Sequence, residues 1–185
     1  MIVGTLAFVG TSIALIGPGA IGATVAAYLH AAGHSVRLCG HTARESIDVH
    51  PDGRDPIAVP GPVHTDPAEV DGPMDVVFIA VKDTQNEQAG AWLARLCHER
   101  TVVCALQNGV EQVERVGRFC PSSTVVPAAI WLSSEIQPEG WVRVRNEPRL
   151  VLPDSTAASA LAELLRDAGV TVELDPDFSL SLIHI

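Results

Sequence analysis

The sequence predicts an α/β fold in which helices flank an open, mostly parallel, doubly wound sheet. Short apolar runs recur along the chain, and runs of this kind are typical of strands buried on both faces. Stretches rich in Ala and Leu, typical of helices, separate these runs. Because strands that alternate with helices usually pair in parallel, the two observations together indicate a parallel sheet. A chain of 185 residues has room for one full domain, or for one domain and a fragment of a second.

The composition excludes several classes of protein. The chain carries 12 basic and 22 acidic side chains, a formal net charge of -10, and it is 47% hydrophobic. This apolar content argues against a disordered chain or a disulfide scaffold. The acidic balance, without a cluster of Lys or Arg, argues against nucleic acid as a partner. The four cysteines form no CxxC pair, and three lie in apolar runs, so we expect reduced thiols in the cytoplasm.

The N-terminal region contains no charged residue before Arg37. Its apolar length would suffice for a membrane span, but glycines and Pro18 interrupt it and no basic residue precedes it, so neither a span nor a signal peptide is expected. We expect residues 1–11 to be an N-terminal extension and residues 12–178 to form a dinucleotide-binding domain. The tail, residues 179–185, reads like a translated sequencing adapter, and a short apolar strand is the alternative.

The expected elements follow from apolar periodicity and from Gly and Pro positions. Residues 40–73 are rich in proline, and loops with short irregular elements are expected there. Strands are expected at Ser12–Ile16, Ser35–Cys39, Asp75–Val81, Thr101–Leu106, Thr124–Ala129, Gly140–Arg145, Arg149–Leu152 and Thr171–Leu174. Helices are expected at Ala23–Ala32, Thr84–Leu96, Val110–Gly117 and Thr156–Ala168.

The strongest motif is GPGAIG, which follows the first expected strand and opens the first expected helix. In such a G-x-G-x-x-G turn the first glycine allows the sharp turn, the second lets a pyrophosphate approach, and the third lets helix and strand pack closely. The N-terminus of the helix then offers N–H groups and a partial positive charge to the phosphates. The motif therefore predicts a Rossmann-like dinucleotide site; a glycine-rich turn without a ligand is the alternative. Its residues are Gly17, Pro18, Gly19, Ala20, Ile21 and Gly22.

The end of the second expected strand indicates which dinucleotide is bound. NAD-binding domains usually carry Asp or Glu there for the ribose 2′-hydroxyl. The sequence at this point is Gly40-His41-Thr42-Ala43-Arg44, without a carboxylate. His41 and Arg44 are suited to a 2′-phosphate instead, so NADP (NADPH) is favoured over NAD. A solvated loop is the alternative interpretation.

Three motifs in order, GPGAIG, AVKDTQ (Ala80–Gln85) and LQNGV (Leu106–Val110), resemble the ketopantoate reductase (2-dehydropantoate 2-reductase) family. The resemblance implies an N-terminal Rossmann domain, a helical C-terminal domain, and reduction of ketopantoate to pantoate with NADPH in pantothenate biosynthesis. It also implies that Lys82 and Gln85 line the cofactor site. Asn108 and Gly109 would lie at the nicotinamide ribose, and Asn108 also at the substrate.

The family's catalytic lysine and its substrate-orienting glutamate belong to the C-terminal domain and have no counterpart here. No catalytic residue is therefore assigned, and we expect an inactive, truncated chain. His41 occupies the position where many family members have an arginine for the 2′-phosphate. NAD therefore remains an alternative to NADP as the cofactor. The expected partners are a 2-keto acid, for the full-length enzyme, and a second copy in a homodimer, but neither nucleic acid nor a membrane.

Two other functions remain open at this point. One is a non-catalytic NAD(P)-sensing regulatory module, and the other is a hydroxyacid dehydrogenase of the 6-phosphogluconate type. No metal site is expected, because the pair His30 and His34 is interrupted by Gly33.

Overall fold

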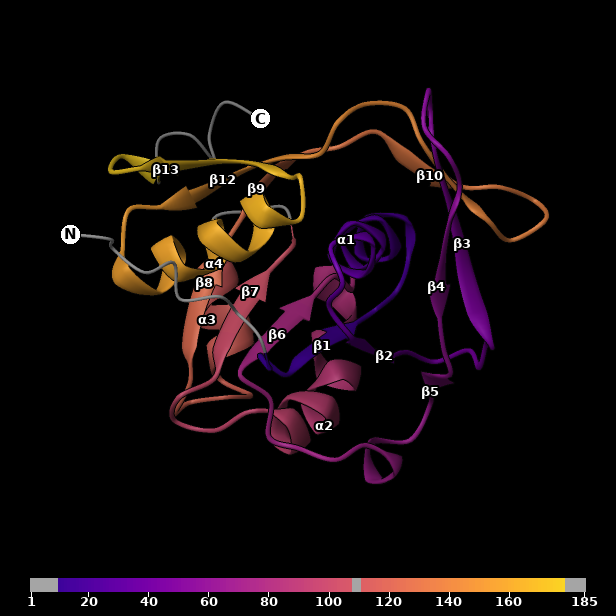
Figure 1. The fold of residues 1–185 in the computed structure, drawn as a ribbon. Coiled ribbons are helices and arrows are strands. Elements are labelled where there is room, and N and C mark those ends of the chain that lie inside the picture. The colour runs from indigo at the N-terminus through magenta and orange to yellow at the C-terminus, as the bar shows by residue number, and fades with distance from the viewer. Residues whose placement is uncertain (1–9, 108–110, 179–185) are drawn as a thin grey trace.

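The computed structural model describes residues 10–107 and 111–178. At its centre lies a sheet of six parallel strands in the order β5-β2-β1-β6-β7-β8 (Figure 1). Strands β2 and β5 are added on one side of β1, and β6, β7 and β8 are added on the other side. The direction in which strands are added therefore reverses between β1 and β6. The strands are β1 (Ile13–Ile16), β2 (Val36–Cys39), β5 (Val63–His64), β6 (Val76–Ile79), β7 (Val102–Ala105) and β8 (Thr124–Pro127).

The two faces of this sheet form two separate cores. Ile13 and Leu15 of β1 belong to the core that includes α1 (Ala20–Ala31), whereas Ala14 and Ile16 belong to the core that includes α2 (Asn86–Leu96). This alternation is the period of two of a β-strand. The short helix α3 (Gln112–Gly117) packs on the α2 side through Val116. Both faces are thus covered, which explains the unbroken apolar runs.

Helix α1 is buried on most of its surface because it lies between two sheets. Its inner side faces the parallel sheet, and its outer side packs against a four-stranded sheet in the order β10-β11-β3-β4 (Figure 1). A helix that is apolar on all sides is typically buried in the core, as α1 is between these two sheets. The strands of this second sheet are β3 (Ser46–Pro51), β4 (Ile57–Pro60), β10 (Ser134–Ile136) and β11 (Val142–Val144).

The expectation of loops in residues 40–73 is wrong for much of that segment. β3 and β4 form an antiparallel hairpin, β5 joins the parallel sheet, and a 3₁₀ turn, η1, spans Pro67–Glu69. Ile47, Val49 and Val59 of the hairpin are buried in the core of α1. The prolines are compatible with these strands because Pro51 and Pro60 are the last residues of β3 and β4, and β4 is an edge strand.

A third sheet closes the side of the molecule next to β8. β12 pairs in parallel with β13 and antiparallel with β9, and α4 connects β12 to β13. The Ser155 hydroxyl accepts the Ala158 N–H at 3.2 Å and so caps α4. The elements are β9 (Ala129–Trp131), β12 (Arg149–Pro153), α4 (Thr156–Asp167) and β13 (Thr171–Asp175).

The α/β class, the mostly parallel central sheet and the flanking helices are confirmed. The other expected strands and helices are present, most with ends shifted by one to three residues. The structure also contains β9 and β10, which were not expected. None of the helices within residues 10–107 and 111–178 is long and apolar enough to cross a membrane. Within the same residues, no group of three or more His, Cys, Asp or Glu side chains could hold a metal ion.

Candidate dinucleotide site

The glycine-rich turn connects β1 to α1 at the edge of the sheet where the order of strands reverses. Gly17 has φ +86°, a conformation that favours glycine, and a Cβ there would lie 2.6 Å from Val81 Cγ1. A Cβ on Gly22 would lie 2.4 Å from the carbonyl oxygen of Gly17 and 3.0 Å from Ala80 Cβ. Gly17 and Gly22 are therefore required by close packing among the turn, α1 and the end of β6.

Gly19 differs from these two glycines because space is open around it. Apart from its chain neighbours, no heavy atom of the described residues lies within 4 Å of a Cβ built on Gly19. Gly19 is also the N-cap of α1, it has no side chain to cap the helix, and the first turn of α1 contains no acidic residue. The N–H groups of this turn, which includes Ala20 and Ile21, are therefore suited to an anion. The arrangement fits a dinucleotide pyrophosphate.

The end of β2 lies directly beside this turn. The Gly17 N–H donates to the Cys39 carbonyl at 2.8 Å, and a Cβ on Gly40 would lie 3.1 Å from Pro18 Cδ. The next residue, His41, is exposed, and its Nδ1 lies 2.8 Å from Thr42 Oγ1. The structure thus brings the predicted 2′-phosphate segment next to the predicted pyrophosphate segment.

Arg44 is also exposed, but it has a structural contact that the sequence did not indicate. Its Nη1 donates to the Gly140 carbonyl at 2.9 Å, in the turn between β10 and β11. Its backbone carbonyl accepts the Val63 N–H at 2.8 Å. Arg44 therefore joins the end of β2 to the four-stranded sheet while it keeps further N–H groups on the same guanidinium.

Lys82 and Gln85 lie just beyond β6, in the 3₁₀ turn η2 (Asp83–Gln85) and its N-cap. The Gln85 N–H donates to the Lys82 carbonyl at 2.8 Å, and the Lys82 N–H donates to Gln85 Oε1 at 3.2 Å. The oxygen of the Gln85 carboxamide thus closes this turn. The Lys82 side chain is exposed, and Lys82 is the only lysine of the sequence.

Asn108 and Gly109 lie outside the described residues, but the helix that follows them is placed. Arg115 of α3 donates to Asp83 Oδ2 at 2.9 Å and to Glu111 Oε2 at 2.7 Å. Arg118 donates to Glu87 Oε1 at 2.8 Å. These exposed ion pairs, although each contributes little stability, hold α3 beside the segment of Lys82.

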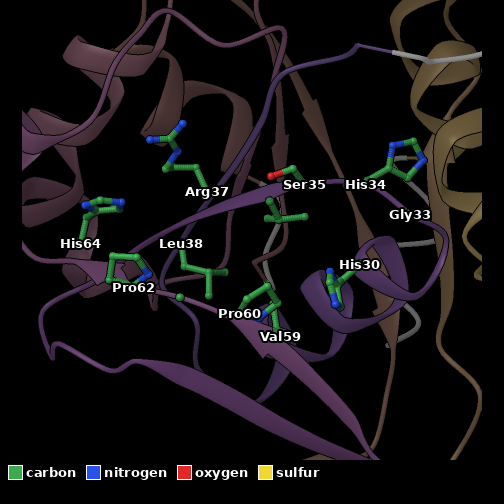
Figure 2. A pocket seen from close by; sticks show the side chains of 12 residues that line it. His30, Gly33, His34, Ser35, Arg37, Leu38, Val59, Pro60, Pro62 and His64 are labelled. Atoms are coloured by element: carbon green, nitrogen blue, oxygen red, sulfur yellow. The ribbon is translucent and has the colours of Figure 1, made fainter.

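A cavity of about 400 Å³ lies elsewhere, between the C-terminal end of α1 and strands β2, β4 and β5 (Figure 2). None of the predicted site residues that the structure describes lines it. In Figure 2, His30 and His34 lie toward one end, whereas Arg37 and His64 lie toward the other, so these side chains do not converge on one point. We therefore place the candidate site at the glycine-rich turn, where the conformation and the packing are specific.

A doubly wound parallel sheet, with a glycine-rich turn at the switch point and an uncapped helix N-terminus behind it, defines a Rossmann-type dinucleotide-binding domain. The comparison with known families agrees with this class. The family model described as ketopantoate reductase PanE/ApbA matches residues 13–156, and the chain belongs to this family.

Relatives and solved structures support the same assignment. The chain is 63% identical over 169 residues to a 2-dehydropantoate 2-reductase of Mycobacterium tuberculosis, a match that covers 91% of this chain and 57% of the relative. It is 32% identical over 170 residues to that of Caulobacter vibrioides, covering 91% and 58%. A dimeric ketopantoate reductase from Staphylococcus aureus matches with a TM-score of 0.79 and 25% identity, over 92% of this chain and 62% of that one. The chain thus spans little more than half the length of these curated relatives.

Sequence reasoning missed three residues that shape the site: Gly40, Asn86 and Gln107. Gly40 packs on Pro18, and Gln107 is buried in contact with Asn86. The signal for Gly40 was its place directly after a strand in a βαβ unit. For Gln107 the signal was a polar residue that ends a buried apolar strand, where a carboxamide without a partner is unfavourable.

Proposed function

We propose that this chain supplies the NADPH-binding domain of a 2-dehydropantoate 2-reductase, which reduces the 2-keto acid ketopantoate to pantoate. The observation that carries the proposal is the convergence of three segments at one edge of the parallel sheet. Pro18 contacts Gly40 and Gly17 contacts Val81, so the glycine-rich turn lies between the residues after β2 and those after β6. The family membership supplies the substrate and the reaction.

Each segment has a distinct task in this proposal. The N–H groups at the start of α1 hold the pyrophosphate, and Gly19 leaves room for it. His41 and Arg44 bind the 2′-phosphate that distinguishes NADPH from NADH. Lys82 and Gln85 line the site on the side of β6.

The proposed position for the substrate lies next to β7. Bound NADPH supplies the hydride that reduces the ketone. Asn108 and Gly109, which directly follow Gln107, are proposed to lie at the nicotinamide ribose, with Asn108 also at the substrate. No catalytic residue is assigned within this chain.

Location and assembly are part of the same proposal. A cytoplasmic protein is supported by four free cysteines, of which Cys39, Cys104 and Cys120 are buried. Burial raises the pKa of Cys39 and of Cys104 to about 12, so both thiols stay protonated and unreactive. A homodimer is proposed because the Staphylococcus aureus reductase of the same fold is dimeric.

Titration of the purified chain with NADPH, followed by the fluorescence of the nicotinamide, tests the proposal. We expect saturable binding, and binding of NADH about tenfold weaker because it lacks the charge-assisted hydrogen bonds to the 2′-phosphate. A chain that keeps its folded circular dichroism but gives no signal with millimolar NADPH would overturn the proposal.

A further inference from the structure

Gln107 is a buried carboxamide at the end of β7 and is 5% exposed. Its Nε2 donates two hydrogen bonds, one to the Val81 carbonyl at 2.9 Å and one to Asn86 Oδ1 at 2.6 Å. Asn86 is 2% exposed. Both protons of one NH₂ group are therefore used inside the protein, where water does not replace a lost partner.

The two acceptors lie at the two ends of the segment that carries Lys82. The Val81 carbonyl belongs to the peptide bond that precedes Lys82, and Asn86 is the first residue of α2. Between them, η2 is closed on itself by the hydrogen bonds between Lys82 and Gln85. A single side chain just beyond β7 thus fixes the start and the end of the short turn that follows the neighbouring strand β6.

We propose that Gln107 is a positioning residue, which places the Lys82 ammonium for the bound dinucleotide by holding Val81 and Asn86. The inference rests on the proposed function, because it gives Lys82 a role toward NADPH. Both hydrogen bonds of Gln107 Nε2 go to protein groups, so its effect on the nucleotide passes through the segment of Lys82.

Gln112 provides a matched control. It is also a buried glutamine at this edge of the sheet, 2% exposed, and it forms hydrogen bonds with the backbone of Ala128, between β8 and β9. Its Oε1 accepts the Ala128 N–H at 3.3 Å, and its Nε2 donates to the Ala128 carbonyl at 3.4 Å. Neither of these two bonds reaches Val81 or Asn86, so we expect Gln112→Glu to disturb the core while the hydrogen bonds of Gln107 stay in place.

The first test is a double-mutant cycle on NADPH affinity. Gln107→Glu keeps the shape of the side chain but replaces the donor with an acceptor that faces two other acceptors. We expect it to weaken NADPH binding about tenfold in the wild-type background and less than about twofold in a Lys82→Met background, because the effects of residues coupled through a shared segment are non-additive. Gln112→Glu should instead have the same effect in both backgrounds. An effect of Gln107→Glu that is equal in both backgrounds, or absent, would overturn the inference.

The second test uses the single lysine and needs no nucleotide. Reductive methylation with ¹³C-formaldehyde keeps the charge of Lys82 and labels it together with the N-terminal amine, and the resonance that is missing from Lys82→Met is that of Lys82. We expect Gln107→Glu to shift the Lys82 ¹³C resonance and Gln112→Glu to leave it in place. An unmoved resonance in Gln107→Glu contradicts the inference.

The two tests separate the inference from the function on which it rests. If the wild type binds no NADPH, the proposed function fails, and a shifted Lys82 resonance still supports the positioning by Gln107. If Gln107→Glu does not fold, Asn86→Ala removes one of the two acceptors more mildly. It should then give a smaller loss that also disappears in the Lys82→Met background, and an additive loss would count against the inference.

Discussion

Gly17 and Val81 are packed so closely that a Cβ on Gly17 would lie 2.6 Å from Val81 Cγ1 and 3.0 Å from the Val81 backbone nitrogen. This contact joins the glycine-rich turn to the strand end that precedes Lys82. It makes the turn part of the core of the sheet as well as the proposed place for the phosphates. Substitution of Gly17 or Gly22 should therefore affect mainly stability, whereas substitution of Gly19 should affect mainly binding.

Gly17→Ala is expected to destabilise the protein. The positive φ of +86° costs a non-glycine residue about 1–2 kcal/mol, and the contact with Val81 adds a packing strain of about 1–3 kcal/mol. Urea unfolding followed by circular dichroism measures the change. A midpoint equal to that of the wild type would show that the turn relaxes freely and would contradict the packing described here.

Gly19→Ala is expected to show the opposite behaviour. Its φ is -74° and the surrounding space is open, so the free energy of unfolding should change by less than about 1 kcal/mol. The added methyl group lies where the pyrophosphate should approach, so NADPH affinity should fall by about tenfold or more. Unfolding and fluorescence titration of the same sample measure both. Unchanged affinity would remove Gly19 from the site.

Arg44→Ala is expected to change the choice between the two nucleotides. Only NADPH carries the 2′-phosphate, so its affinity should fall about tenfold while that of NADH changes little, since a charge-assisted hydrogen bond contributes about 1.5–3 kcal/mol. Arg54→Ala is a matched control, because Arg54 is also exposed and pairs with Glu147 at 2.5 Å. An equal loss for both nucleotides would mean that the contact of Arg44 with Gly140 matters and that the phosphate contact does not.

The pair Ser12 and Asp75 is expected to make stability depend on acid pH. The Ser12 N–H and hydroxyl donate to Asp75 Oδ2 at 2.9 and 2.8 Å, and these bonds lower the pKa of Asp75. In the unfolded chain the carboxyl has its ordinary pKa of about 3.9. The stabilisation is therefore complete above about pH 5, declines as the pH falls through the unfolded and then the folded pKa, and is absent below both.

Asp75→Asn tests this dependence without a change of side-chain volume. The difference in melting temperature between wild type and variant should be largest near pH 7 and should shrink as the pH is lowered through 4. Asp71→Asn is a suitable control, because Asp71 is an exposed carboxylate on the same loop. A difference that stays constant between pH 7 and pH 3 would contradict the assignment.

The parts of the fold that follow from local pattern could be predicted from the sequence. The first strand and α1 are examples, because buried parallel strands are continuously apolar and the glycine motif marks the turn between them. The β3–β4 hairpin could not, because Pro51 and Pro60 suggested loops, and only the packing of Ile47 and Val59 on α1 explains why strands form. Tertiary context determined the outcome there.

The candidate site likewise has residues that the local sequence predicts and contacts that only the tertiary structure reveals. The motif residues were predicted because each lies just after an apolar strand, and the carboxyl ends of parallel strands share one edge of the sheet. The contact of Arg44 with Gly140 spans 96 residues of sequence, and that of Gln107 with Asn86 joins two elements. Side-chain pairs of this kind depend on register between elements, which the local sequence does not specify.

The most direct test of the central claim, that the chain holds the phosphates of NADPH at the glycine-rich turn, is an amide NMR map of NADPH binding on ¹⁵N-labelled protein. We predict the largest shifts at residues 19–22, at Gly40 and His41, and at residues 82–85. Shifts confined to the cavity at His30, His34 and Arg37, or the absence of any shift at saturating NADPH, would contradict it.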